Sequence, residues 1–329
     1  FYTATVYEKG AEVVRMQANL LGPETFRRAT DLYFDRFDGQ AVTTDDFVTC
    51  MEEASGRDLT QFRRWYAQAG TPVLTVSDRW EPETGTYTLT VRQHTPATPG
   101  QTHKDPLHIP VAMGLIDQSG RELPVRLDGE PAGRAPGTRM LELRAAEESF
   151  RLVGLAERPV ASLLRGFSAP VKLRMERPDA DLALLMAHDS DGFSRWDAAQ
   201  ELMQQTLLAG VRGGGTGLPD ALAAAFRGAL ADRDGDLALI AEVLTLPSES
   251  YLADQMEVVD VDGIHASREG LRRELGLALR ADLLAVYRAS TDDGPYRLDP
   301  EAMGRRAIKN LCLAYLMAAG DGEAGGLCQ

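Results

Sequence analysis

Cysteine, histidine and long apolar runs are all scarce in this chain of 329 residues. Its 3 cysteines are odd in number and widely spaced, which disfavours a disulfide framework and fits a reducing, cytoplasmic compartment. No apolar run approaches the roughly 18 residues that a membrane-spanning helix needs. Lys and Arg number 35 against 49 Asp and Glu, a formal net charge of −14. Because nucleic acid and anionic membranes attract basic surfaces, we expect neither as a partner.

The length and the ends of the chain suggest several domains within a longer polypeptide. The chain exceeds the roughly 250–300 residues at which single cores stop growing, so we expect two or three domains. An apolar fraction of 44% with 26% charged residues is ordinary for a globular protein. The start, Phe1-Tyr2-Thr3, lacks Met, a basic segment and an apolar segment. We therefore interpret the sequence as an excerpt.

Residues 1–70 have the 3.6-residue periodicity of helices. A helix start is expected at Thr43 or Thr44, because Asp45 and Asp46 suit the positive end of a helix dipole. Another helix is expected from Asp58 to Gly70. The buried stripes that this periodicity predicts are Val13, Met16 and Leu20, then Phe26, Ala29, Tyr33 and Phe37, then Phe62, Trp65 and Tyr66.

At Thr71 the periodicity changes to two residues, as in β-strands. Threonines alternate with Tyr87, Leu89 and Val91, which predicts one face in a core and the other in water. The same alternation recurs in Ile109, Val111, Met113 and Leu115, in Leu141 and Leu143, and in Phe150 and Leu152. Short strands with turn signals between them, and no intervening helix, predict an antiparallel β-sandwich over residues 71–172.

Helical periodicity returns near Pro178 and continues to the end of the chain. Ser194-x-x-Asp197 resembles a capping box, and Asp299 before Pro300 indicates a further helix start. The stripes expected in the core are Trp196, Ala199, Met203 and Leu207, and Ile308, Leu311, Cys312 and Tyr315. Five or more helices with short loops predict a solenoid-like domain over residues 173–329.

The residues that could carry chemistry form few recognisable motifs. The 5 histidines include no H-E-x-x-H, so no metal site is predicted within the chain. Asp232-x-Asp234-x-Asp236 resembles a calcium loop, but Leu237 and Val243 stand where that loop needs Gly and Glu, which favours a polar loop with a helix cap. Gly213–Gly217 lacks the lysine of a phosphate loop and indicates a linker. His188 is interpreted as a helix-end residue.

Tyr7, at the start of the first helix, has two possible roles. Tyrosine is usually a packing residue with a polar tip. A phenol can also donate a hydrogen bond to a developing oxyanion without carrying a charge. The spacing of residues alone leaves both roles open.

Several separate blocks of residues follow one another along nearly the whole chain. They include Val6-Tyr7-Glu8-Lys9-Gly10-Ala11, Phe62-Arg63-Arg64-Trp65-Tyr66, Thr95-Pro96-Ala97-Thr98-Pro99-Gly100, Phe167-Ser168-Ala169-Pro170-Val171-Lys172 and Phe193-Ser194-Arg195-Trp196-Asp197-Ala198-Ala199-Gln200. In this order the blocks resemble the gluzincin zinc aminopeptidases of the bacterial aminopeptidase N (alanyl aminopeptidase) type.

The resemblance implies a multidomain α+β enzyme that removes N-terminal amino acids from peptides with a free N-terminus. Residues 1–70 would be the helical end of a thermolysin-like catalytic domain, residues 71–172 a β-sandwich domain, and residues 173–329 the first part of a C-terminal helical domain. The resemblance implies that Tyr7 stabilises the tetrahedral oxyanion and that Tyr2 lines the pocket for the first side chain.

The resemblance also implies a Zn²⁺ cofactor whose ligands lie outside this chain, since neither H-E-x-x-H nor G-x-M-E-N occurs in it. The isolated excerpt would then be inactive. An alternative interpretation is a non-enzymatic scaffold or peptide-binding protein, built from a β-sandwich and helical repeats. An H-E-x-x-H motif in the sequence preceding Phe1 would favour the enzyme, and its absence would favour the scaffold.

Overall fold

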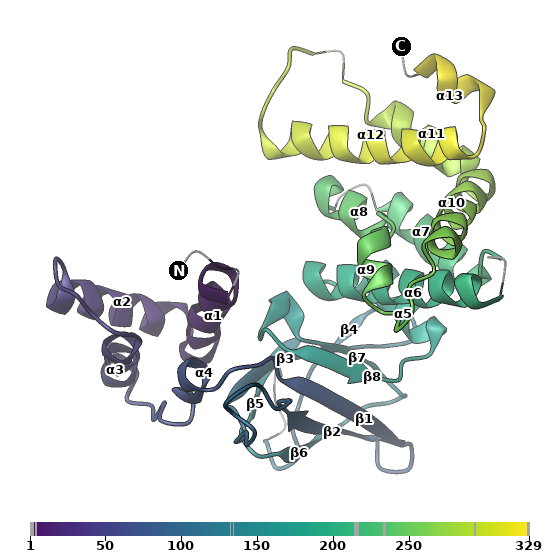
Figure 1. Ribbon diagram of the computed structural model, residues 1–329. Helices are drawn as coiled ribbons and strands as arrows, with labels where there is room; N and C mark the ends of the chain where they lie inside the picture. The colour runs from purple at the N-terminus through teal and green to yellow at the C-terminus, as the bar shows by residue number, and fades with distance from the viewer. Residues whose placement is uncertain are drawn as a thin grey trace. The chain divides into compact units, whose positions relative to one another are not determined.

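The computed structural model describes residues 3, 5–131, 133, 135–213, 217–232, 235–292 and 294–327. The chain divides into two compact units, Phe1–Glu176 and Arg177–Gln329. The first unit contains a group of helices followed by a β-sandwich, and the second unit is helical (Figure 1). The order of helix, sandwich and helix agrees with the order of periodicities along the sequence.

The helices of the first unit are a π-helical turn η1 (Thr5–Lys9), α1 (Gly10–Leu21), α2 (Pro23–Phe37), α3 (Thr44–Ser55) and α4 (Arg64–Ala67). Val13, Met16 and Leu20 of α1 are buried, as their spacing predicts. Thr43 caps α3 by accepting a hydrogen bond from the Asp46 N–H, while the Asp46 carboxylate accepts from the Thr43 N–H. This capping box confirms the predicted helix start.

The helix expected from Asp58 to Gly70 is wrong in its first half, because only α4 within this stretch is α-helical. The Asp58 carboxylate accepts a hydrogen bond from the Thr60 N–H at 2.8 Å. The Leu59 N–H donates to Glu52 at 2.9 Å. These two donors would also lack a backbone acceptor in the first turn of an α-helix. The segment departs from an α-helix because the Arg64 and Trp65 N–H groups donate to carbonyls three residues back, at 3.2 and 3.0 Å.

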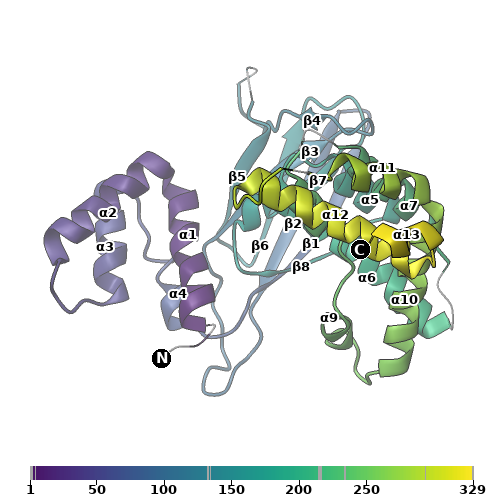
Figure 2. The same cartoon turned by 90° about the horizontal axis from the view of Figure 1, so that it is seen from above.

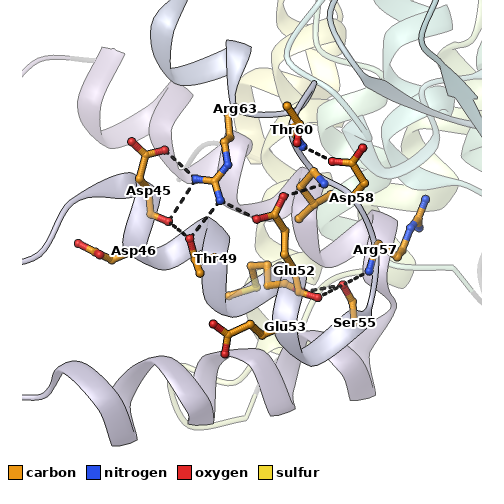
Figure 3. Close-up of polar contacts among 12 residues, drawn as sticks. Asp45, Asp46, Thr49, Glu52, Glu53, Ser55, Arg57, Asp58, Thr60 and Arg63 are labelled. Atoms are coloured by element: carbon orange, nitrogen blue, oxygen red, sulfur yellow. Dashed lines mark hydrogen bonds and ion pairs between the residues drawn. The ribbon is translucent and has the colours of Figure 1, made fainter.

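Arg63 ties this turn to α3, as Figure 3 shows. Its guanidinium donates to Asp45 Oδ1 at 2.7 Å, to Thr49 Oγ1 at 3.1 Å and to Glu52 Oε2 at 2.6 Å. All three acceptors lie on α3, one or two turns apart. The segment leading into α4, and with it Trp65, is therefore held against α3 by a single planar cation.

The sandwich contains β1 (Val73–Glu81), β2 (Thr86–His94), β3 (Ile109–Ile116), β4 (Glu122–Leu123), β5 (Thr138–Leu143), β6 (Glu147–Val153), β7 (Val160–Leu163) and β8 (Lys172–Met175). One sheet has the order β6-β2-β1-β8, and the other has β4-β3-β5 with β7 paired to β3. All pairs are antiparallel except β1 and β8, which run parallel with Val73 opposite Lys172. After β7 the chain passes from one sheet to the other, where β8 runs in the same direction as β1 beside it.

The two longest alternating patterns have different outcomes. In β2, Tyr87, Leu89 and Val91 are buried as predicted. In β3 every residue is buried, which the expected one-sided pattern did not predict. The reason is that α1 and the short 3₁₀ turn η2 (Arg165–Phe167) both contact β3. A strand covered on both faces needs no polar side.

The second unit contains α5 (Asp179–His188), α6 (Gly192–Gly213), α7 (Asp220–Ala231), α8 (Leu237–Val243), α9 (Glu249–Ala253), α10 (Val261–Ala278), α11 (Arg280–Ala289), α12 (Pro300–Ala318) and α13 (Gly322–Leu327). Within this unit α12 packs on α8, α10 and α11, and α10 also packs on α6 (Figures 1 and 2). At the crossing of α10 with α12, a Cβ on Gly276 would stand 2.3 Å from the Tyr315 carbonyl oxygen. Gly276 therefore permits the close approach of these two helices.

Helix starts in this unit agree with the sequence at one predicted site and differ at another. Asp299 caps α12 by accepting from the Ala302 N–H, and Pro300 is its first residue, as predicted. Ser194 lies inside α6 instead of capping it, and the Ser194 N–H donates to Asp191 at 2.8 Å. An aspartate before the helix thus takes the place of the expected serine. None of the helices in the described ranges is long and apolar enough to cross a membrane.

A buried histidine lies where the helices of the first unit meet the sandwich. His108 is fully buried, and its Nε2 lies 2.9 Å from the Glu142 carboxylate, which also accepts from Arg57 at 2.6 Å. Its Nδ1 is buried and has no hydrogen-bond partner among the described residues. Burial, followed by the nearby Arg144 charge, lowers the pKa of His108 below its usual value despite the attraction of Glu142. The folded protein therefore favours neutral His108.

Acidification through the imidazole range is expected to destabilise the first unit. The unfolded chain binds the His108 proton near pH 6.5, before the folded chain does, so stability falls as the pH drops below that value. For one such group the slope reaches about 1.4 kcal/mol per pH unit. Urea unfolding at pH 7.5, 6.5 and 5.5 measures it. His108→Gln should flatten the dependence, while His103→Gln, at a histidine whose side chain is 87% exposed, should not. If the free energy of unfolding depends equally on pH in the wild type and both variants, His108 is not the group responsible.

Candidate active-site segment

Tyr7 lies in η1, the π-helical turn that precedes α1. The backbone N–H groups of Val6 and Tyr7 both donate to the Thr3 carbonyl, at 3.0 and 3.1 Å. Tyr7 is 59% exposed, so solvent reaches its side chain. Short π-helical segments are uncommon and occur frequently at functional sites. The Tyr7 side chain is thus exposed within this chain, on a backbone of an uncommon type, and both roles considered for it stay predictions.

Lys9, the last residue of η1, connects this turn to the start of the sandwich. Its Nζ donates to the Gly70 carbonyl at 2.7 Å and lies 6.0 Å from the centre of the Trp65 ring. Burial lowers the pKa of Lys9. Trp65 is itself held in place, because its indole N–H donates to the His108 carbonyl at 2.9 Å.

Further along, α1 is attached to the sandwich by polar contacts around its apolar stripe. Arg15 donates to the carbonyls of Gly166 and Phe167. Asn19 donates to the Ser168 carbonyl at 3.4 Å. Phe167 has a φ of 51°, in the left-handed region that residues with a Cβ rarely adopt, so Arg15 binds a strained loop. α1 is thus held at both of its ends.

The other candidate residues lie at helix ends or outside the described residues. Tyr2 and Asp234 lie outside the described residues, as do residues 214–216 of the expected linker. Asp236 caps α8 by accepting from two backbone N–H groups, which confirms the helix cap expected there. His188 is in the last turn of α5, as predicted. Among the described residues, no group of three or more His, Cys, Asp or Glu side chains could hold a metal ion.

The sequence analysis named Tyr7 as a candidate but did not single out Lys9, which contacts Gly70 and Trp65. Lys9 and its acceptor Gly70 are 61 residues apart in the chain. Neither has a local pattern that marks the pairing. The only signal was the presence of Lys9 in the block Val6-Tyr7-Glu8-Lys9-Gly10-Ala11.

Three family models match the chain in succession. Residues 1–66 match the peptidase family M1 domain. Residues 70–176 match a domain of unknown function, DUF3458, with an Ig-like fold, and residues 179–329 match its C-terminal companion, DUF3458_C, made of ARM repeats. These descriptions agree with the helical end, the β-sandwich and the helical solenoid expected from the sequence.

Individual relatives lead to the same family. Aminopeptidase N of Escherichia coli is 46% identical over 320 residues, which is 96% of this chain and 36% of that protein. Aminopeptidase N of Haemophilus influenzae is 39% identical over the same shares. The crystal structure of Legionella pneumophila aminopeptidase A in complex with aspartic acid superposes with a TM-score of 0.85 at 30% identity, covering 99% of this chain and 37% of that one.

The chain spans a little over a third of the length of these relatives. The similarity extends through both compact units, from the helices around Tyr7 to the last helices of the second unit. The chain therefore belongs to the M1 peptidase family of bacterial aminopeptidase N type, and comprises the end of the M1 domain, the Ig-like domain and helices of the ARM-repeat domain.

Proposed function

We propose that this chain is part of a zinc-dependent aminopeptidase that hydrolyses N-terminal amino acids from peptides with a free N-terminus. The observation that carries the proposal is the 46% identity to Escherichia coli aminopeptidase N over 96% of the chain. The described residues do not fit a zinc site, since they contain no cluster of metal ligands. In this proposal the zinc ligands belong to a segment outside the chain, and the chain supplies Tyr7.

The proposed role of Tyr7 is to donate a hydrogen bond to the oxyanion of the tetrahedral intermediate. When a peptide carbonyl is attacked, negative charge develops on its oxygen, and a neutral donor aimed at that position stabilises the transition state more than the substrate. The exposure of Tyr7 and the anchored turn that carries it support this role. Tyr2 is proposed to line the pocket for the first side chain, on the basis of the family resemblance alone.

We also propose that residues 1–70, 71–172 and 173–329 belong to three domains of the larger protein. Two observations support this division. β1 begins at Val73, and the residue ranges matched by the three family models end and begin within a few residues of both boundaries. A cytoplasmic location is proposed as well. It is supported by Cys50 and Cys312, which are buried free thiols of the kind that persist in a reducing compartment.

Replacing Tyr7 by Phe in the full-length enzyme should lower kcat by about 10²–10³-fold with KM little changed, because one oxyanion donor is lost while the ring remains. Steady-state kinetics on an aminoacyl p-nitroanilide, with a melting temperature and a zinc content for each protein, measure the effect. Tyr33→Phe is the matched control, since Tyr33 packs among the rings of Phe34, Phe37 and Phe47. A Tyr7→Phe enzyme that keeps more than about a tenth of the wild-type kcat would contradict this role.

The chain of 329 residues, purified alone, should hold no stoichiometric zinc and should show no peptidase activity. A protein zinc site needs three or four converging ligands, and the described residues bring no such group together. Elemental analysis after dialysis against buffer containing a trace of zinc measures the metal content. One equivalent of zinc retained per chain would show that the metal site lies within this sequence after all.

A further inference from the structure

Within the described residues, the turn that carries Tyr7 packs little against an apolar core. None of the five residues of η1 is buried there. The apolar stripe of α1 begins only at Val13, almost two helical turns beyond Tyr7. A catalytic donor has to be held to within a fraction of an ångström, so a directional contact beside the turn bears on its position.

Lys9 makes such a contact, and both groups that it meets lie in closely packed surroundings. The Gly70 carbonyl accepts from Nζ at 2.7 Å, and Gly70 has a φ of 100°, which a residue with a Cβ would not adopt without strain. A Cβ there would also approach the Thr95 methyl group to 3.1 Å. The second group, Trp65, is only 6% exposed.

Among the described residues, no carboxylate forms an ion pair with Lys9. Within the described part of the chain, Lys9 forms a hydrogen bond to a carbonyl and lies beside an aromatic ring, but no ion pair with it is found. Partial burial of an ammonium without a counter-ion disfavours its charged form, in agreement with its lowered pKa. A surface lysine would avoid this cost by extending into water. Its inward orientation is consistent with a role in holding the turn.

We propose that Lys9 is the positioning residue for Tyr7, a role that rests on the proposed function of Tyr7. Lys9 lies two residues after Tyr7 in the chain. Its ammonium connects the turn η1 to the Gly70 carbonyl and to the face of the Trp65 ring. Removing the anchor would let the turn shift while the core of α1 stays intact. A displacement of about 1 Å at a reacting group can lower the rate by roughly 10²-fold.

A double-mutant cycle in the full-length enzyme tests this proposal. Lys9→Met keeps most of the aliphatic side chain and removes the donor, and it should lower kcat about tenfold or more with KM changed less than about twofold, since positioning acts on the transition state. In a Tyr7→Phe background the same substitution should change kcat less than about twofold, because no donor remains to be positioned. Lys9→Arg, which keeps a cationic donor, should recover part of the loss.

Lys104→Met is the matched control. Lys104 also donates to a carbonyl of this loop, that of Ala69 at 2.9 Å, but from the sandwich side and without touching η1. It should lower the melting temperature without lowering kcat. If Lys9→Met yields no folded protein, Lys9→Leu, which also lacks a donor, takes its place in the cycle.

The possible outcomes separate the two proposals. Normal turnover in Tyr7→Phe would refute the function proposed for Tyr7, and the positioning role of Lys9 with it. A large loss in Tyr7→Phe, together with an equal effect of Lys9→Met in both backgrounds, would refute Lys9 as the positioning residue and leave Tyr7 intact. Equal losses of kcat in Lys9→Met and Lys104→Met would also refute it, because the loop as a whole would then be responsible.

Discussion

The packing of α1 across β3 is the contact on which the first unit depends. Val13, Met16 and Leu20 of α1 belong to the same apolar core as the inward residues of both sheets, so the helices and the sandwich share one interior. Because β3 is buried on both faces, removal of α1 would expose an apolar strand to water. The helical end of the M1 domain and the Ig-like domain are thus mutually dependent, and the sandwich provides a fixed frame for the turn that carries Tyr7.

Polar contacts around this core determine the orientation of α1 on the sandwich. Arg57 donates to the Leu20 carbonyl at the end of α1 and to Glu142 of β5, while Arg15 binds the strained loop after β7. Apolar packing is non-directional and tolerates sliding, whereas these hydrogen bonds have defined geometry. Hydrophobic burial holds α1 against the sandwich, and hydrogen bonds from a few cationic side chains to carbonyl groups fix its position along the sheet. Lys9 extends the same principle to the exposed end of the helix.

In the proposed function, the chain contributes geometry to catalysis more than it contributes reactive groups. Its proposed catalytic group is one phenol, and the described residues contain no metal cluster. A tyrosine suits this task because it donates without a charge that would have to be desolvated. The second unit is stabilised separately, for example by Tyr315, whose buried hydroxyl donates to the Leu244 carbonyl at 2.6 Å. Burial raises the pKa of Tyr315, so this hydroxyl stays protonated and remains a donor.

The sequence by itself determined features that depend on neighbouring residues. The capping box of Thr43 and Asp46 and the start of α12 at Asp299 and Pro300 follow from local hydrogen bonding and fixed φ. The alternation in β2 follows from the geometry of a strand. Even the family could be inferred from the sequence, since blocks of residues carry it. The helix expected from Asp58 is shortened because the N–H groups of residues 64–66 donate to carbonyls three residues back instead of four.

Only the tertiary structure decided which distant residues meet. The parallel pairing of β8 with β1, the burial of both faces of β3 and the contact between Lys9 and Gly70 all join segments far apart in the chain. No local periodicity encodes such pairings, because each depends on how complete elements pack and which carbonyls that packing leaves within reach. Tyr7 could therefore be named from the sequence, whereas the lysine that anchors its turn became visible only once the chain was folded.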